Sequence, residues 1–355
     1  MTMYKHSEIE VLHLEVTDKC NASCPQCARN DSGGAVNPLL TITELRLSDI
    51  EKMFSDGLAR RLRQVILCGG YGDAVMARDT IDICEFFRKE NPDVLIGMHT
   101  NGSARSVDWW REMARVLQPG YMCFGVDGLA DTNHIYRRGT RFELIMRNAQ
   151  AYIDAGGYAI WDYILFAHNE HQVREADELS KKMGFKLFQI KETPRFFDKK
   201  NTVMIKDFQV KDSEGKIISK ISPPKFTQSS LPHVSIEDLR RKTGGYKGYL
   251  TTTPIKCQVA EIKSMYITAD GYALPCCYLG SHVHRQGANV DNDNFLAKVE
   301  ALGGFDAIDA KKRPLREIVD GPLFQVAVPE SWKEGPERNP TCARICGSEP
   351  RLVRG

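Results

Sequence analysis

The chain up to about residue 197 alternates short β-branched or aromatic runs with longer amphipathic stretches, and this alternation constrains the fold more than any other feature. It predicts strands at residues 11–16, 64–67, 94–99, 121–126, 160–167 and 185–191. It predicts the intervening helices at residues 44–59, 79–89, 107–117, 142–155 and 170–183. Parallel strands need helical crossovers between them, so the six strands predict a parallel α/β sheet. Periodicity leaves open whether that sheet is doubly wound or a partial barrel; in both, ligands gather beyond the carboxyl ends of the strands.

The composition excludes several classes of protein. A length of 355 residues predicts about two domains, and 42% apolar with 26% charged residues excludes a disordered chain. The 48 basic and 46 acidic residues balance, so no net field draws the chain to nucleic acid or to a membrane surface. The sequence has no signal-peptide core and no apolar run near the ~20 residues of a membrane helix, so we expect a cytoplasmic protein.

The second half of the chain differs in character from the alternating region. Residues 198–250 carry eleven Lys or Arg against six Asp or Glu, and prolines and glycines interrupt them. We interpret this segment as a solvated linker, with a basic lid over an anionic substrate as the alternative. Residues 251–355 are predicted to form a small α+β domain built on a β-hairpin, because Asp270 and Gly271 suit a tight hairpin turn.

The eleven cysteines are clustered, and in a reducing compartment such clusters are more often metal ligands or catalytic groups than disulfides. Cys20, Cys24 and Cys27 follow the first strand with the spacing C-x3-C-x2-C. A zinc site needs a fourth ligand, and no candidate is adjacent. On a four-iron cluster, three thiolates leave one iron open for an external ligand. We therefore favour a cluster, with a structural zinc site that borrows a distant ligand as the alternative.

This motif, preceded by the Glu15–Thr17 segment, resembles the signature of the radical S-adenosylmethionine (SAM) superfamily. The resemblance covers the alternating region, and it implies a partial (β/α)6 barrel over residues 1–197. It also implies a [4Fe-4S] cluster on the three cysteines, whose open iron is chelated by SAM. An electron from an external donor such as a flavodoxin or ferredoxin then cleaves SAM to methionine and a 5′-deoxyadenosyl radical, which abstracts a hydrogen atom from the substrate.

Other segments lie where this family places its SAM contacts. The run Gly69, Gly70, Tyr71, Gly72 and Asp73 follows the second strand and resembles the glycine-rich motif that meets the SAM ammonium group. It is a variant, because Tyr71 replaces the usual acidic residue and Asp73 stands two places on. The resemblance also implies SAM contacts after strands three to five, at Thr100, Asn101, Asp127, Arg137 and Asn169.

Several residues at the ends of the fourth and sixth strands carry open questions. Gly125 replaces the serine that is common two residues before Asp127, which removes a hydroxyl that could bond SAM. The guanidinium of Arg137 suits the SAM carboxylate, although an exposed cation at a helix start is the alternative. The catalytic candidates are Asp127 together with Lys191 and Arg195, which end the sixth strand; surface charge is the alternative for the last two.

A second cysteine group lies in the carboxyl-terminal domain. Cys257, Cys276, Cys342 and Cys346 supply four thiolates, enough to close one cluster completely. The pattern resembles the truncated "twitch" form of the SPASM auxiliary domain, which implies a second, auxiliary [4Fe-4S] cluster. A four-cysteine zinc ribbon is the alternative. Cys277 is left over, as a buried thiol or an alternative ligand.

The remaining cysteines lie on predicted strand or helix faces. Cys68, Cys84 and Cys123 are therefore predicted to be small core residues. His282 and His284 have no third metal ligand nearby in the sequence, and we interpret them as loop histidines.

These features predict a radical SAM enzyme in which the auxiliary cluster accepts an electron during a net oxidation or a crosslink. The opposing class is a non-enzymatic iron–sulfur or zinc protein for electron transfer, which would need no glycine-rich SAM segment. The first strand begins near residue 9, which leaves little room ahead of it for a leader-binding domain. We therefore expect a small-molecule or nucleotide-like substrate, with a peptide presented by a separate leader-binding protein as the alternative.

Overall fold

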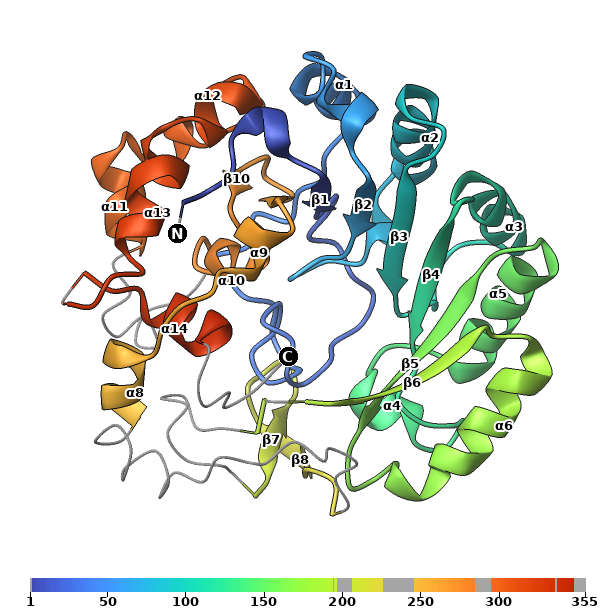
Figure 1. The fold of residues 1–355 in the computed structure, drawn as a ribbon. Helices are drawn as coiled ribbons and strands as arrows, with labels where there is room; N and C mark the ends of the chain where they lie inside the picture. Colours follow the sequence, from blue (N-terminus) through green and yellow to red (C-terminus); the bar gives the residue numbers. More distant parts are fainter. Residues whose placement is uncertain are drawn as a thin grey trace.

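Figure 1 shows the chain as a computed structural model, which describes residues 2–193, 195–196, 206–225, 246–284, 295–335 and 337–347. Its main element is a sheet with the strand order β10-β9-β1-β2-β3-β4-β5-β6. The first six strands are parallel and follow the order of the sequence: β1 (Val11–Leu14), β2 (Gln64–Leu67), β3 (Leu95–Thr100), β4 (Gly120–Gly125), β5 (Ala159–Leu165) and β6 (Leu187–Glu192).

Five helices of this region lie along the outer side of the curved sheet (Figure 1): α1 (Leu47–Met53), α2 (Thr80–Glu90), α3 (Val107–Val116), α5 (Phe142–Asp154) and α6 (Val173–Met183). The short helix α4 (Asn133–Tyr136) instead packs beside the cysteine loop through Tyr136. A doubly wound sheet would carry helices on both faces, so the arrangement is a partial barrel, as the family resemblance implied. The outer face is packed with large buried side chains such as Trp110, Phe124 and Trp161.

Local signals explain most helix boundaries. The Ser106 hydroxyl accepts a hydrogen bond from Trp109 N at the start of α3, and Gly184 ends α6 in the left-handed region at φ 91°. The helix predicted at residues 44–59 was too long, because α1 ends at Met53 and Gly57 turns the chain at φ 82°. A short 3-10 helix, Leu58–Arg61, follows that turn.

The carboxyl-terminal region contains the predicted hairpin, formed by β9 (Ser264–Ile267) and β10 (Ala273–Leu274). The sequence did not predict that β9 pairs in parallel with β1, so the hairpin continues the sheet of the barrel. This pairing covers an edge of β1 that would otherwise expose its backbone groups. The helices of this region are α8 (Tyr246–Thr252), α9 (Gln258–Glu261), α10 (Cys277–Gly280), α11 (Phe295–Ala301), α12 (Leu315–Val319), α13 (Val328–Glu330) and α14 (Pro340–Cys346).

The basic stretch at residues 198–250 contains a hairpin that the sequence analysis did not predict. Its strands are β7 (Phe208–Lys211) and β8 (Ile217–Ile221), and their Val210 and Ile221 side chains are buried beside Ala22, Cys24, Tyr136 and Phe166. The hairpin is therefore packed against the barrel through these two side chains, although most residues of β8 are exposed to solvent. Residues 197–205 and 226–245, on which much of the lid alternative falls, lie outside the described residues.

None of the helices in the described ranges has the length and apolar character that a membrane crossing requires.

Candidate functional site

The loop that carries the first three cysteines leaves the carboxyl end of β1 and is closed at its base. Asp18 N donates to Thr43 O at 3.0 Å, and Leu45 N donates to Val16 O at 2.8 Å. These bonds return the chain to the strand from which it left. The loop is therefore held at the end of the sheet where parallel α/β folds bind their ligands.

The three cysteines of this loop are near enough for Cys24 and Cys27 to influence the ionisation of Cys20. Cys27 N donates to Cys24 O at 3.1 Å, and Asn101 Nδ2 lies 3.7 Å from Cys20 Sγ. Burial raises the pKa of Cys20 to about 12, and Asp73, Cys24 and Cys27 add to the rise. Thiols gathered and buried in this way need a metal to hold them as thiolates. The donor set therefore fits an iron–sulfur cluster with three protein ligands.

Glu15 holds the glycine-rich loop against the end of β1. Its side chain is buried, and its Oε1 accepts hydrogen bonds from Tyr71 N at 2.7 Å and Gly72 N at 3.1 Å. The Tyr266 hydroxyl of β9 donates to the other carboxylate oxygen. Burial raises the pKa of Glu15, and these hydrogen bonds oppose the rise. In the sequence, Glu15 is recognisable only as part of the family signature. Its role as the acceptor that holds the glycine-rich loop was not predicted.

The glycines of this loop allow close contact between backbones. A Cβ on Gly72 would collide with Thr17 O, and a Cβ on Gly69 would lie 2.5 Å from Gly72 O. A Cβ on Gly70 would meet only the Glu15 carboxylate, at an ordinary 3.7 Å. Glycine is therefore required at 69 and 72 to pack the loop, whereas position 70 has space for a methyl group.

Asp73 connects the glycine-rich loop to the end of β3. Its Oδ2 accepts from Thr100 Oγ1 at 3.0 Å and from Asn101 N at 2.8 Å, and its Oδ1 accepts from Val75 N at 3.2 Å. The structure thus brings together three of the residues expected to contact SAM. Their direct contact with SAM stays a prediction.

Asp127 positions Arg137 beside the cysteine loop. Arg137 Nε lies 2.6 Å from Asp127 Oδ2, and the Asp127 carboxylate is fully buried. Burial lowers the pKa of Arg137, but the charges of Asp127, Cys24 and Tyr136 and the hydrogen bond to Asp127 together outweigh burial and raise the pKa above its usual value. Arg137 also forms a hydrogen bond with the Cys24 thiol. Burial raises the pKa of Cys24, and Arg137 opposes this rise. Arg137 is therefore no exposed cation at a helix start.

The glycine that replaces the family's usual serine has a structural reason. A Cβ on Gly125 would lie 2.5 Å from Arg137 Nη2, so the guanidinium occupies the space that a serine side chain would need. Asn169, also buried, accepts from Phe166 N at 2.8 Å and donates both N–H groups, to Asp127 O and Ile164 O at 2.9 Å each. Its amide therefore holds the Asp127 backbone in place.

The two cations on and just after β6 lie in different surroundings. Lys191 Nζ forms an ion pair with Asp162 Oδ2 at 2.5 Å. Arg195 Nη1 donates to the backbone oxygen of Gln26 at 3.1 Å, and the Gln26 amide returns a bond to Arg195 O at 3.2 Å. Lys191 is thus part of the inner face of the barrel, whereas Arg195 braces the cysteine loop.

The second cysteine group also gathers in space. Lys256 N donates to Cys346 O at 2.9 Å, which brings Cys257 beside Cys346. A hydrogen bond between these two thiols raises the pKa of Cys257 and lowers that of Cys346 to about 7. The charge of Cys276 also raises the pKa of Cys257. Cys342 lies one helical turn before Cys346 on α14. Three of the four residues predicted as ligands, Cys257, Cys276 and Cys346, therefore lie near one another, and Cys342 lies on the same helix as Cys346.

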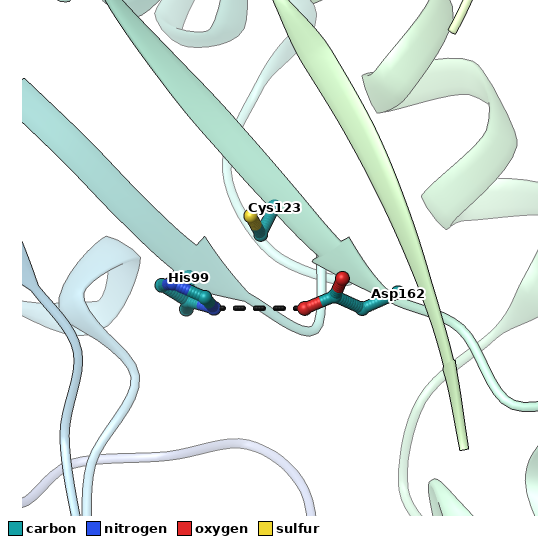
Figure 2. A group of neighbouring side chains, drawn as sticks. All are labelled: His99, Cys123 and Asp162. Atoms are coloured by element: carbon teal, nitrogen blue, oxygen red, sulfur yellow. Dashed lines mark ion pairs between the residues drawn. The ribbon is translucent and has the colours of Figure 1, made fainter. Parts of the chain in front are cut away.

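Cys277 is the neighbour of Cys276 in the chain and raises the pKa of the Cys276 thiol. Burial raises the pKa of the Cys277 thiol to about 12. Cys68, at the end of β2, and Glu15 raise it further by smaller amounts. Cys84 is buried in the core, as predicted. Cys123 instead lies with His99 and Asp162 on the inner face of the sheet (Figure 2). The sequence signal that could have revealed this is one His, Cys or Asp within each of three strands that are otherwise largely apolar.

Comparison with known proteins agrees with this geometry. Residues 14–179 match the family model described as the Radical SAM superfamily. The chain carries a radical SAM domain. No curated protein shows significant sequence similarity to the chain.

Solved structures of radical SAM proteins share the fold. The crystal structure of Streptococcus suis SuiB bound to the precursor peptide SuiA aligns with a TM-score of 0.55 and 13% identity, over 90% of this chain and 67% of that chain. The structure of anSMEcpe with bound AdoMet aligns with a TM-score of 0.50 and 13% identity, over 95% of this chain and 88% of that chain. At such identities the likeness shows the fold alone.

The glycine-rich loop of the radical SAM domain yields a matched pair of variants. We expect Gly72→Ala to push this loop away from the cysteine loop and to lower the iron that Cys20, Cys24 and Cys27 retain after anaerobic reconstitution. Gly70→Ala should keep the iron content of the unmodified protein, because its new methyl group meets no backbone atom. Iron analysis of both variants checks this, and equal iron in the two would contradict the packing argument.

Removal of the Glu15 carboxylate should destabilise the same domain. Glu15→Ala leaves two buried backbone N–H groups and the Tyr266 hydroxyl without their acceptor, which should lower the free energy of unfolding by about 3 kcal/mol. Glu15→Gln keeps an acceptor oxygen and should lose less. Urea unfolding under reducing conditions measures both. The control is Glu10→Ala, since Glu10 is an exposed carboxylate that pairs with Lys263 and should matter little. A similar loss in the Glu15 and Glu10 alanine variants would disprove the role of Glu15.

Proposed function

We propose that this protein is a radical SAM enzyme that cleaves SAM reductively and abstracts a hydrogen atom from a substrate on the inner face of the barrel. The observation that carries the proposal is the contact between the three-cysteine loop and the glycine-rich loop, held by Glu15 and Gly72. A non-enzymatic electron carrier would need the cysteines but no such loop beside them.

The residues of the site have separate tasks in this proposal. Cys20, Cys24 and Cys27 hold the cluster, which when bound supplies the electron that splits SAM into methionine and a 5′-deoxyadenosyl radical. The backbone of the Gly69–Gly72 loop receives the SAM ammonium group. Arg137, oriented by the buried Asp127, is placed to receive the SAM carboxylate, because a guanidinium binds a carboxylate through two parallel hydrogen bonds.

We further propose that Cys257, Cys276, Cys342 and Cys346 bind an auxiliary [4Fe-4S] cluster. The thiol–thiol contact between Cys257 and Cys346 and the placement of Cys342 on the same helix as Cys346 support this ligand set. Four thiolates leave no iron open, so the group suits electron transfer rather than substrate binding. An electron-transfer role for the auxiliary cluster fits a net oxidation or a crosslink of the substrate. The electron for the first cluster would come from an external donor such as a flavodoxin or ferredoxin.

The inner face of the barrel supports a polar substrate. His99, Asp162 and Lys191 place an imidazole, a carboxylate and an ammonium group there. Such a lining suits a small molecule or a nucleotide-like compound that carries hydroxyl, amine or phosphate groups. A peptide delivered by a separate leader-binding protein is the second candidate, and it is favoured by the structural likeness to SuiB, which was solved with a precursor peptide.

Iron and SAM turnover test the proposal. We expect about eight irons per chain after anaerobic reconstitution, four for each cluster. Replacing Cys20, Cys24 and Cys27 together by alanine should leave about four irons and abolish the formation of 5′-deoxyadenosine with dithionite and SAM. The unmodified, fully loaded protein is the reference, and its failure to form 5′-deoxyadenosine would rule out the enzyme.

The auxiliary cluster has its own test. Alanine at Cys257, Cys276, Cys342 and Cys346 should also leave about four irons per chain, now on the first cluster. Cys277→Ala is the matched control, because Cys277 lies outside the proposed set of four ligands and is influenced by Cys68 and Glu15, and it should keep about eight irons. Stoichiometric zinc at the four cysteines, with iron excluded, would replace the auxiliary cluster by a structural zinc site.

A further inference from the structure

The inner face of the barrel holds a third group of possible metal ligands, separate from both cysteine groups. His99, Cys123 and Asp162 each offer one ligand atom, and these atoms all lie within 4.8 Å of one another. Figure 2 shows the three side chains converging from neighbouring strands, with His99 Nδ1 3.7 Å from Asp162 Oδ2. Nitrogen, sulfur and oxygen donors thus meet at one point of the sheet.

The strand register explains this convergence. His99 of β3 is paired directly with Cys123 of β4, and Asp162 of β5 is paired with Gly125, two residues beyond Cys123. Residues two apart on a strand point to the same face, so all three side chains project to the inner face. The outer face of these strands is apolar and covered by helices. The polar group is therefore a feature of the inner face and not of the packed core.

Asp162 is the least satisfied member of the group. Asp162 is only 6% exposed, and its Oδ1 atom is buried with no hydrogen-bond partner among the described residues. Its Oδ2 is held by Lys191. A buried carboxylate oxygen without a partner costs free energy, and a coordinated cation would remove that cost. A hydrogen bond to the second oxygen is the support that ligating carboxylates usually have.

We propose that His99, Cys123 and Asp162 bind a zinc ion on the inner face of the barrel. Imidazole, thiolate and carboxylate are the ligands that zinc prefers, whereas magnesium and calcium prefer oxygen alone. The thiolate and the carboxylate bring two negative charges to the ion, and the carboxylate also pairs with the Lys191 ammonium group. Three protein ligands are the pattern of zinc sites that keep a fourth position open.

The open position gives the site a use. The His99 side chain is 35% exposed although it lies on a central strand, so the group is accessible from solvent. A hydroxyl, carboxylate or amine of the substrate would occupy the fourth position of the zinc ion. The site would then anchor the substrate on the face where the proposed reaction takes place. The zinc site itself does not depend on SAM cleavage.

The experiment uses the protein with both clusters loaded, so that iron occupies the seven cluster cysteines. After treatment with a chelating resin, we expect one zinc ion per chain to bind and to survive gel filtration, as measured by mass spectrometry of the metals. Zinc X-ray absorption should show one sulfur at about 2.3 Å and nitrogen or oxygen ligands at about 2.0–2.2 Å.

Three variants sharpen the test. Cys123→Ala and Asp162→Asn should both lose the retained zinc, and Cys123→Ala should lose the sulfur signal. Cys84→Ala is the matched control, because this thiol lies in the core and is not part of the ligand group, and it should keep one zinc. Circular dichroism confirms that each variant folds. If a variant does not fold, the zinc X-ray absorption spectrum of the unmodified protein still shows whether the ion has one sulfur ligand together with nitrogen or oxygen ligands.

Several results would overturn the site. They are the absence of retained zinc, zinc with only sulfur ligands, and equal zinc in the unmodified protein and in Asp162→Asn. Iron content and 5′-deoxyadenosine formation, measured on the same unmodified sample, report on the proposed function. A protein that cleaves SAM but binds no zinc would refute the zinc site alone, and one that binds zinc but cleaves no SAM would refute the enzyme alone.

Discussion

The buried carboxylate of Glu15 is the interaction on which the arrangement of the site depends. It lies just past β1 and accepts hydrogen bonds from the glycine-rich loop after β2 and from Tyr266 on β9. A buried charge is tolerated only where its hydrogen bonds are made, so the carboxylate requires all of these partners to be in place. One side chain thus joins the barrel, the loop proposed to receive SAM, and the hairpin that leads to the second cysteine group.

The two faces of the sheet have different roles: the outer face forms the apolar core, and the inner face carries polar side chains. Helices cover the outer face with apolar side chains, which supply the core through the removal of apolar surface from water. The inner face carries His99, Asp162 and Lys191, which add little to such a core. The His99 side chain on this face is 35% exposed, whereas Asp162 is buried, and the β7–β8 hairpin packs beside the cysteine loop.

The departures from the family pattern are connected with one another. Gly125 leaves the space that the Arg137 guanidinium occupies, and Asp127 holds that guanidinium by an ion pair. Asn169 in turn fixes the Asp127 backbone. A change at one of these positions therefore alters the others, and a serine restored at position 125 would displace the cation rather than add a hydroxyl.

The sequence by itself determined the features that local patterns encode. Alternating strands and helices predicted the six parallel strands, the Asp270–Gly271 turn predicted the β9–β10 hairpin, and cysteine spacing predicted the two ligand groups. Tertiary structure decided the pairing of β9 with β1, the packing of β7–β8, and the meeting of His99, Cys123 and Asp162. These contacts join residues far apart in the chain, and they follow from strand register and sheet curvature, which no local stretch of sequence encodes.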